Sequence, residues 1–292
     1  MAVTANPLAT KAGCEVLRDG GSAMDAAVAA QMVLGLVEPQ SSGLGGGAFL
    51  LYYDAATKTV RSYDGRETAP AAATEDYLRY ISASDKSNPL PRLSSAFNST
   101  RASGRSIGTP GAVRMLEMAH KDYGQRPWAE LFNPAIAIAT EGFPIGGRMA
   151  AAIAGARADL LRDPDAVAYF LNSDLSAKAL GTVIKNPDYA ATLRSLASGG
   201  ANAFYTGPIA ESIVNKIATS SGGPAGPGPI TPGLTSLQDL ANYRAIRRDP
   251  VCSSYRDTWV CGMGPPSSGG IAVAQTLGIL ENFDLAAYKP TQ

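Results

Sequence analysis

The chain has 292 residues, of which 45% are hydrophobic and 17% charged, enough for one large domain or two smaller ones. Its 25 Lys and Arg residues balance 25 Asp and Glu residues, so no net charge attracts nucleic acid or an anionic membrane. Apolar runs such as Ala26–Val37 are interrupted and shorter than the roughly 18 residues of a membrane-spanning helix. We therefore expect neither a nucleic-acid partner nor a membrane partner.

Two helices are predicted at the beginning of the chain. Apolar residues recur at helical spacing over residues 7–18, and Gly20-Gly21 ends that helix. Ser22 and Asp25 then form a capping-box pattern, which predicts a second helix to about Val37. The small side chains of this second helix suit tight packing in an interior.

Strands and further helices follow. The β-rich runs 49–54 and 59–63 predict a hairpin, whereas the polar residues 83–106 predict an exposed loop that is at least partly mobile. The Gly- and Pro-rich residues 221–229 predict a flexible surface connection. Helical patterns cover residues 112–123, 127–140, 188–197, 208–218, 237–243 and about 269–283.

Two of the three cysteines lie in one predicted hairpin. Cys252 and Cys261 flank a turn near Arg256-Asp257, and pairing across that turn would set them opposite each other. Cross-strand partners lie about 4.5 to 5.5 Å apart at Cα, which is within reach of a disulfide. The sequence leaves two alternatives open, a disulfide or two small buried hydrophobic residues. Cys14, on a predicted helix, is interpreted as a buried apolar residue.

The Gly-rich segment formally satisfies a dinucleotide-binding pattern at Gly43, Gly45 and Ala48. That pattern requires a strand before the glycines and a helix after them, so that the helix N-terminus meets the pyrophosphate. Here a helix precedes and a strand follows, and no P-loop lysine is present. The pattern therefore favours close backbone packing over nucleotide binding.

Histidine-dependent catalysis and zinc binding have little support. His120 is the only histidine, so every Ser-His-Asp or Cys-His mechanism would depend on it, and no zinc-type ligand set exists. We expect His120 to be a solvated side chain at a helix C-terminus. Ser267 and Ser268 lack the nucleophile-elbow pattern, so we interpret them and the following glycines as capping and tight packing.

Arg66 is the most informative charge, because it follows a strand in a glycine-containing turn. A guanidinium there could bind a carboxylate through two parallel hydrogen bonds. The alternative is a local ion pair with Asp64 or Glu67, and the pattern alone favours that alternative.

Taken together, the chain resembles the γ-glutamyltransferases over nearly its whole length. Six motifs occur in that family's order: Pro7-Leu-Ala-Thr-Lys-Ala-Gly13, Asp19-Gly-Gly-Ser-Ala-Met-Asp-Ala-Ala-Val28, Gly43-Leu-Gly-Gly-Gly-Ala-Phe49, Asp64-Gly-Arg-Glu-Thr-Ala-Pro70, Gly108-Thr-Pro-Gly111 and Gly264-Pro-Pro-Ser-Ser-Gly-Gly270. The resemblance identifies residues 1–292 as a single domain, the large-subunit portion of a two-subunit enzyme. It implies an α+β fold, the four-layer αββα sandwich of N-terminal-nucleophile hydrolases, completed by a small subunit.

The resemblance also implies the chemistry. A precursor cleaves itself, and the threonine exposed on the small subunit acts as nucleophile with its own amine as base. It takes the γ-glutamyl group of glutathione or a similar donor, and water or an amino-acid or peptide amine accepts it. No metal or organic cofactor is implied.

Among the residues of this chain, the resemblance assigns a role only to Arg66, which falls on the family's arginine for the donor α-carboxylate. That role reverses the preference for the local ion pair. No catalytic residue is expected here, because the family's Thr-Thr-His-like processing context is absent and Thr291 comes too early in the family pattern. We therefore expect the chain to be inactive without its small subunit.

Two alternatives stay open. One is a cephalosporin acylase of the same fold that acts on glutaryl side chains, and the other is a non-catalytic homologue that serves as a binding protein. The N-terminus lacks a signal-peptide pattern, but a processed chain would have lost it. The resemblance and the potential disulfide predict a periplasmic or secreted location.

Overall fold

The computed structural model describes residues 1–82, 85–89, 102–219 and 230–288. Helix α1 (Pro7–Arg18) packs on α2 (Ala23–Val37), and both have the predicted bounds. The capping box of α2 is confirmed, because Ser22 accepts the Asp25 N–H and Asp25 accepts the Ser22 N–H. Two thirds of α2 is buried, as its small and apolar side chains predict.

A three-stranded antiparallel sheet lies against these helices. Strands β1 (Ala48–Asp54) and β2 (Thr59–Gly65) form the predicted hairpin, and β7 (Ile246–Arg248) pairs with the other edge of β2. Side chains of β1 alternate between the helices and the outside, so that Leu51 and Tyr53 remain exposed. One face of the sheet is thus covered by helices and the other carries uncovered apolar side chains.

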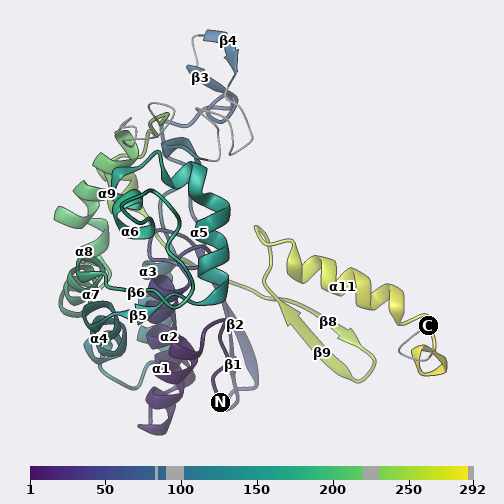
Figure 1. Ribbon diagram of the computed structural model, residues 1–292. Helices are drawn as coiled ribbons and strands as arrows, with labels where there is room; N and C mark the ends of the chain where they lie inside the picture. The colour runs from purple at the N-terminus through teal and green to yellow at the C-terminus, as the bar shows by residue number, and fades with distance from the viewer. Residues whose placement is uncertain (83–84, 90–101, 220–229, 289–292) are drawn as a thin grey trace.

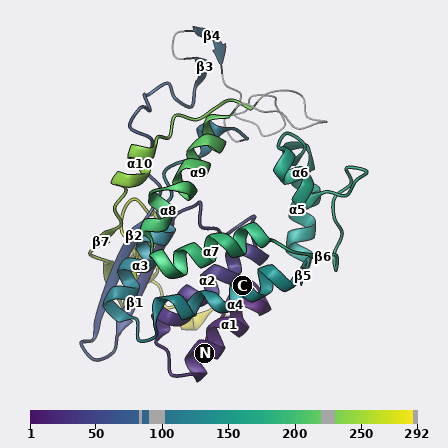
Figure 2. The ribbon, with the colours of Figure 1, turned by 90° about the vertical axis from the view of Figure 1, so that its left-hand side faces the viewer.

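The helices form layers on the covered face (Figures 1 and 2). Helix α3 (Ala112–Tyr123) contacts β1 and β2, and α2 lies beside it. Helices α4 (Asn133–Glu141) and α7 (Pro187–Gly199) pack together farther from the sheet. The remaining helices of this body are η1 (Gly104–Ser106), η2 (Trp128–Phe132), α5 (Gly147–Leu160), α6 (Pro164–Phe170), α8 (Asn202–Tyr205), α9 (Pro208–Ala218) and α10 (Leu237–Asn242).

Several elements differ from the sequence prediction. Helices α5 and α6 and strand β7 were not predicted. Residues 85–89, within the predicted exposed loop, form strand β4 (Asp85–Pro89), which pairs with β3 (Tyr80–Ser82). Gly104, in the same predicted loop, is buried because it packs against the backbone of Gly233 and Ile217. The rest of that loop and the predicted connection 221–229 lie largely or wholly outside the described residues. Strands β5 (Phe143–Pro144) and β6 (Val183–Ile184) form a further small pair.

The last described elements extend away from the body (Figure 1). Strands β8 (Val251–Tyr255) and β9 (Thr258–Gly262) form a hairpin, α11 (Gly269–Leu280) packs on it, and η3 (Leu285–Ala287) follows. We call residues 251–280 the arm. Gly262 and Gly270 touch directly, since a Cβ on Gly262 would come within 2.6 Å of the Gly270 Cα.

Of the two alternatives left open for Cys252 and Cys261, the disulfide is confirmed. Cys252 and Cys261 are direct cross-strand partners and form a disulfide. Cys14 is free and half-buried rather than fully buried. Among the described residues, no helix combines the length and apolar character needed to cross a membrane.

Candidate functional site

Arg66 follows the last residue of β2, and its side chain is 60% exposed. It lines a hollow of about 510 Å³. The other walls come from the Gly-rich segment, the turn after β2 and the residues around η1, namely Gly45, Glu67, Thr68, Ala69, Pro70, Tyr77, Leu78, Arg105, Ser106, Ile107 and Gly108. A guanidinium placed in this way is accessible to a small anionic ligand.

The backbone of Arg66 is held on both sides. Its N–H donates to Oδ1 of the buried Asp64 at 2.8 Å, and its carbonyl accepts the Tyr243 hydroxyl at 2.7 Å. The second oxygen of Asp64 accepts from Nε of Arg248 at 2.7 Å. The position of the turn is therefore set by two side chains, one of them distant in sequence.

Glu67 joins Arg66 to the Gly-rich segment. Its Oε2 lies 3.2 Å from Nε of Arg66, and its Oε1 accepts the N–H of Gly47 at 2.7 Å. Glycine is required at position 47, because a Cβ there would lie 2.7 Å from the Gly65 carbonyl oxygen. The predicted close packing is thus confirmed at Gly47, but not at Gly43 or Gly45, where an added Cβ would have no atom nearer than 4.0 Å.

The local ion pair predicted for Arg66 with Asp64 or Glu67 forms with Glu67, while Asp64 pairs with Arg248. The shortest approach of Glu67 to the guanidinium is at Nε. Over the described ranges, neither Nη1 nor Nη2 of Arg66 donates a hydrogen bond to another residue. These two nitrogens form one of the guanidinium edges that can bind a carboxylate in parallel geometry.

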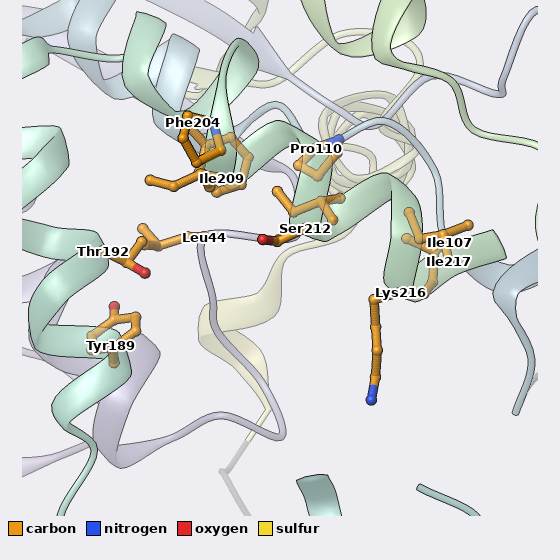
Figure 3. Close-up of a pocket in the computed structure, with 13 residues that line it drawn as sticks. Leu44, Ile107, Pro110, Tyr189, Thr192, Phe204, Ile209, Ser212, Lys216 and Ile217 are labelled. Carbon is orange, nitrogen blue, oxygen red and sulfur yellow. The ribbon is translucent and has the colours of Figure 1, made fainter. Parts of the chain in front are cut away.

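A second, mostly apolar cavity of about 680 Å³ adjoins the Arg66 hollow and shares Gly45 and Ile107 with it. Figure 3 shows Leu44 of the Gly-rich segment facing side chains of α7 and α9. Lys216 is at its edge and binds Asp163 and Asp165 at 2.7 and 2.6 Å. The Gly-rich segment therefore separates a charged hollow from an apolar one.

The prediction that His120 is solvated is wrong. Its side chain is only 13% exposed, and its Nε2 lies 3.2 Å from Oδ1 of Asp25, which has no exposed surface. Its ring also contacts Trp128 edge-on at 5.2 Å. His120 lies in the last turn of α3, as predicted, but there it packs between helices and faces neither hollow.

The serines before α11 have a modest structural role. Ser268, at the N-cap, makes no capping hydrogen bond, while Oγ of Ser267 accepts the Gly269 N–H at 3.2 Å. The tight packing predicted for this motif is confirmed by the contact of Gly262 and Gly270. In the part of the chain that the structure describes, no group of three His, Cys, Asp or Glu side chains could hold a metal ion.

The sequence and the fold have the same relatives. A family model described as gamma-glutamyltranspeptidase matches residues 9–292. The chain is 35% identical over 288 residues to a glutathione hydrolase proenzyme of Bacillus subtilis strain 168, covering 99% of this chain. The chain belongs to the gamma-glutamyltranspeptidase family. The structure also matches a crystal structure of the Helicobacter pylori gamma-glutamyltranspeptidase, with a TM-score of 0.87 and 33% sequence identity. The match covers 100% of this chain and 77% of that chain, and this member therefore has the N-terminal-nucleophile hydrolase fold.

Other members of the superfamily are acylases. The chain is 34% identical over 294 residues to the acylase ACY 1 proenzyme of Pseudomonas sp. strain V22, covering 98% of this chain and 48% of the relative. The chain also spans only 45% of the Bacillus relative's length. It therefore corresponds to about half of each of these two proenzymes.

Proposed function

We propose that this chain is the large-subunit part of a γ-glutamyltransferase and glutathione hydrolase, in which Arg66 binds the α-carboxylate of the γ-glutamyl donor. The observation that carries the proposal is the exposed guanidinium of Arg66, whose Nη1 and Nη2 donate no hydrogen bond among the described residues, in an open hollow of a chain of this family. Glu67 approaches the guanidinium most closely at Nε and orients it, so that Nη1 and Nη2 are left to bind a carboxylate. Because the α-carboxylate and the γ-carbonyl belong to the same glutamyl group, binding of the carboxylate at Arg66 restricts where the γ-carbonyl can lie.

The reaction proposed for the assembled protein needs no histidine and no cofactor. The hydroxyl oxygen of the small subunit's threonine adds to the γ-carbonyl carbon, while the threonine amine takes the hydroxyl proton. The C–N bond breaks and the amine product leaves with a proton. Water or an amino-acid or peptide amine then attacks the resulting ester and releases the threonine. Arg66 holds the donor through both steps.

Kinetics of the assembled two-half protein test the role of Arg66. For Arg66→Ala, we expect the KM of a γ-glutamyl anilide to rise at least about 30-fold, since losing one charged pair costs about 2 to 5 kcal/mol. Arg61→Ala, on the exposed side of the same strand, should leave KM within about twofold. An unchanged KM in Arg66→Ala would contradict the proposed role.

The relationship to ACY 1 acylase supports a second candidate, an acylase that acts on glutaryl groups. A glutaryl group has the carboxylate but lacks the α-amine. The γ-glutamyl anilide should be the better substrate of this protein, and a preference for the glutaryl anilide would favour the acylase. If the small subunit begins with a residue other than Thr, Ser or Cys, the chain is a non-catalytic binding protein instead.

We further propose that the small subunit covers the arm. Helix α11 contains no charged residue, and among its residues only Gly270 is buried. A helix that is apolar on all sides belongs in a protein interior, and about half of the relatives' length lies outside this chain.

The disulfide of the arm fits an oxidising location, which we propose to be the periplasm or the cell exterior.

A further inference from the structure

We infer that Tyr243 is a positioning residue for substrate binding: its hydroxyl fixes the backbone from which the Arg66 guanidinium extends. The inference rests on the proposed role of Arg66 and adds to it a residue 177 positions away in the sequence. Tyr243 itself would touch no substrate.

Tyr243 is rigidly placed. It follows α10, is 4% exposed, and stacks on Tyr205 with ring centroids 5.7 Å apart and an interplanar angle of 9°. The Gly111 backbone packs so closely on the phenol that a Cβ at position 111 would collide with the hydroxyl. A ring held in this way cannot move its oxygen far from the Arg66 carbonyl.

The hydroxyl remains a hydrogen-bond donor at every pH of interest. Burial, with the nearby carboxylates of Asp64 and Glu67, raises the pKa of Tyr243 to about 12. The neutral phenol has one proton to donate, and the Arg66 carbonyl at 2.7 Å accepts it. The contact is therefore a permanent anchor and not a switch.

The anchor matters because the side chain of Arg66 is 60% exposed and its sequence neighbour Glu67, 3.2 Å from Nε, is its one ion-pair partner among the described residues. Asp64 holds the Arg66 N–H, and Tyr243 holds its carbonyl. Without the hydrogen bond from Tyr243, the backbone of the turn can move and displace the Arg66 guanidinium. A small displacement weakens donor binding, because two parallel hydrogen bonds require a strict geometry. The carboxylate contact is made equally in the ground state and the transition state, so its loss should appear in KM rather than kcat.

The test uses the assembled protein and a γ-glutamyl anilide. We expect Tyr243→Phe to raise the donor KM about 5- to 20-fold and to change kcat less than about twofold. In an Arg66→Ala background, Tyr243→Phe should have no further effect on KM, because the group that it positions is gone. A merely structural role would lower activity in both backgrounds.

Tyr205→Phe is the matched control. Tyr205 is equally buried, belongs to the same ring stack, and donates its hydroxyl to the Pro110 carbonyl at 2.9 Å, not to Arg66. It should leave the donor KM within about twofold, while thermal unfolding reports any loss of stability in either variant.

The possible failures are distinguishable. An unchanged KM in Arg66→Ala would remove the proposed function itself. A raised KM in Arg66→Ala with an unchanged KM in Tyr243→Phe would overturn only this inference. Equal effects of the two tyrosine substitutions, or a Tyr243→Phe protein that no longer folds, would assign the hydroxyl to general stability and overturn it as well.

Discussion

Asp25 is a carboxylate with no exposed surface that links the start of α2 to the end of α3. It accepts the N–H groups of Ser22, Gln125 and Arg126 at 2.7 to 3.2 Å, and His120 lies beside it. Burial by itself would raise the pKa of Asp25, but these hydrogen bonds outweigh it and hold the pKa below its usual range. The ionised form is therefore part of the folded structure.

The lowered pKa determines how stability should depend on pH. The unfolded chain binds a proton at Asp25 at higher pH than the folded chain, so the contribution of Asp25 is complete above about pH 4. It is lost as the pH falls through the folded-state pKa. We expect Asp25→Asn to lower the free energy of unfolding at pH 7 by about 3 kcal/mol and to make its decline in acid shallower.

Urea unfolding between pH 7 and pH 3 measures this effect. Asp19→Asn changes an exposed carboxylate at the end of α1 and should shift the free energy of unfolding by less than about 0.5 kcal/mol. If the free energy of unfolding of Asp25→Asn fell with pH as steeply as that of the unsubstituted chain, Asp25 would not be the group that causes the loss of stability in acid.

At the scale of elements, the arm combines an exposed apolar helix with a hairpin that is closed covalently. Ile271, Val273 and Ile279 of α11 are 41%, 48% and 62% exposed, and Trp259 of β9 is 74% exposed. A patch of this kind marks an interaction surface. The proposed occupant is the small subunit.

Substitution of Ile279 tests that surface. Ile279→Lys should weaken association of the two halves at least about tenfold, because a lysine ammonium would be buried without a partner. Leu180→Lys changes a residue of similar exposure, 68%, in the body and should leave association unchanged. Titration of one half with the other provides the measurement.

A second copy of the chain is the competing occupant of the arm. It would be revealed if the chain alone formed a dimer in sedimentation experiments and Ile279→Lys dissociated it. Association of the halves that was insensitive to Ile279→Lys would contradict the proposed surface.

Elements with strong local signals were predictable from the sequence. The capping box of α2 and the β-rich runs of the β1–β2 hairpin predicted those bounds to within about two residues. Helix α5 was missed because its alanine-rich sequence lacks an apolar stripe, and only Met149 and Ile153 are buried. Strand β7 has three exposed side chains and is defined only by backbone pairing, which no side-chain pattern reveals.

The site was predictable to a similar extent. Arg66 was found because its turn and its family motif are local. The contact of Tyr243 with Arg66 joins residues far apart in sequence and exists only in the folded chain. His120 was misplaced for the same reason, since its partner Asp25 belongs to another helix.

For the molecule as a whole, we propose one domain consisting of the body, with the arm as its extension and not as a second domain. The hydrophobic core joins residues from Ala9 to Ala245 and includes no residue of the arm. Leu51 and Tyr53 also leave one sheet face apolar and uncovered. Both features fit the proposal that the small subunit covers these surfaces.

Hydrogen exchange can test this division. In the chain alone, amides of α2 and α7 should exchange slowly and those of α11 rapidly. A helix with few buried side chains needs little free energy to unfold locally, and its amides then exchange with solvent. Addition of the other half should slow exchange in α11 while changing α2 little. Equal protection of α11 and α2 in the chain alone would contradict the division.

The disulfide of the arm has one more consequence. Cys252 and Cys261 are direct partners in the ladder, and a slip of one residue in a strand would turn its side chains to the opposite face. The face of the hairpin that contains Gly262 packs on α11, and the opposite face presents Trp259. The covalent link therefore allows a single register, so the oxidised hairpin keeps its inner and outer sides distinct even before anything binds to it.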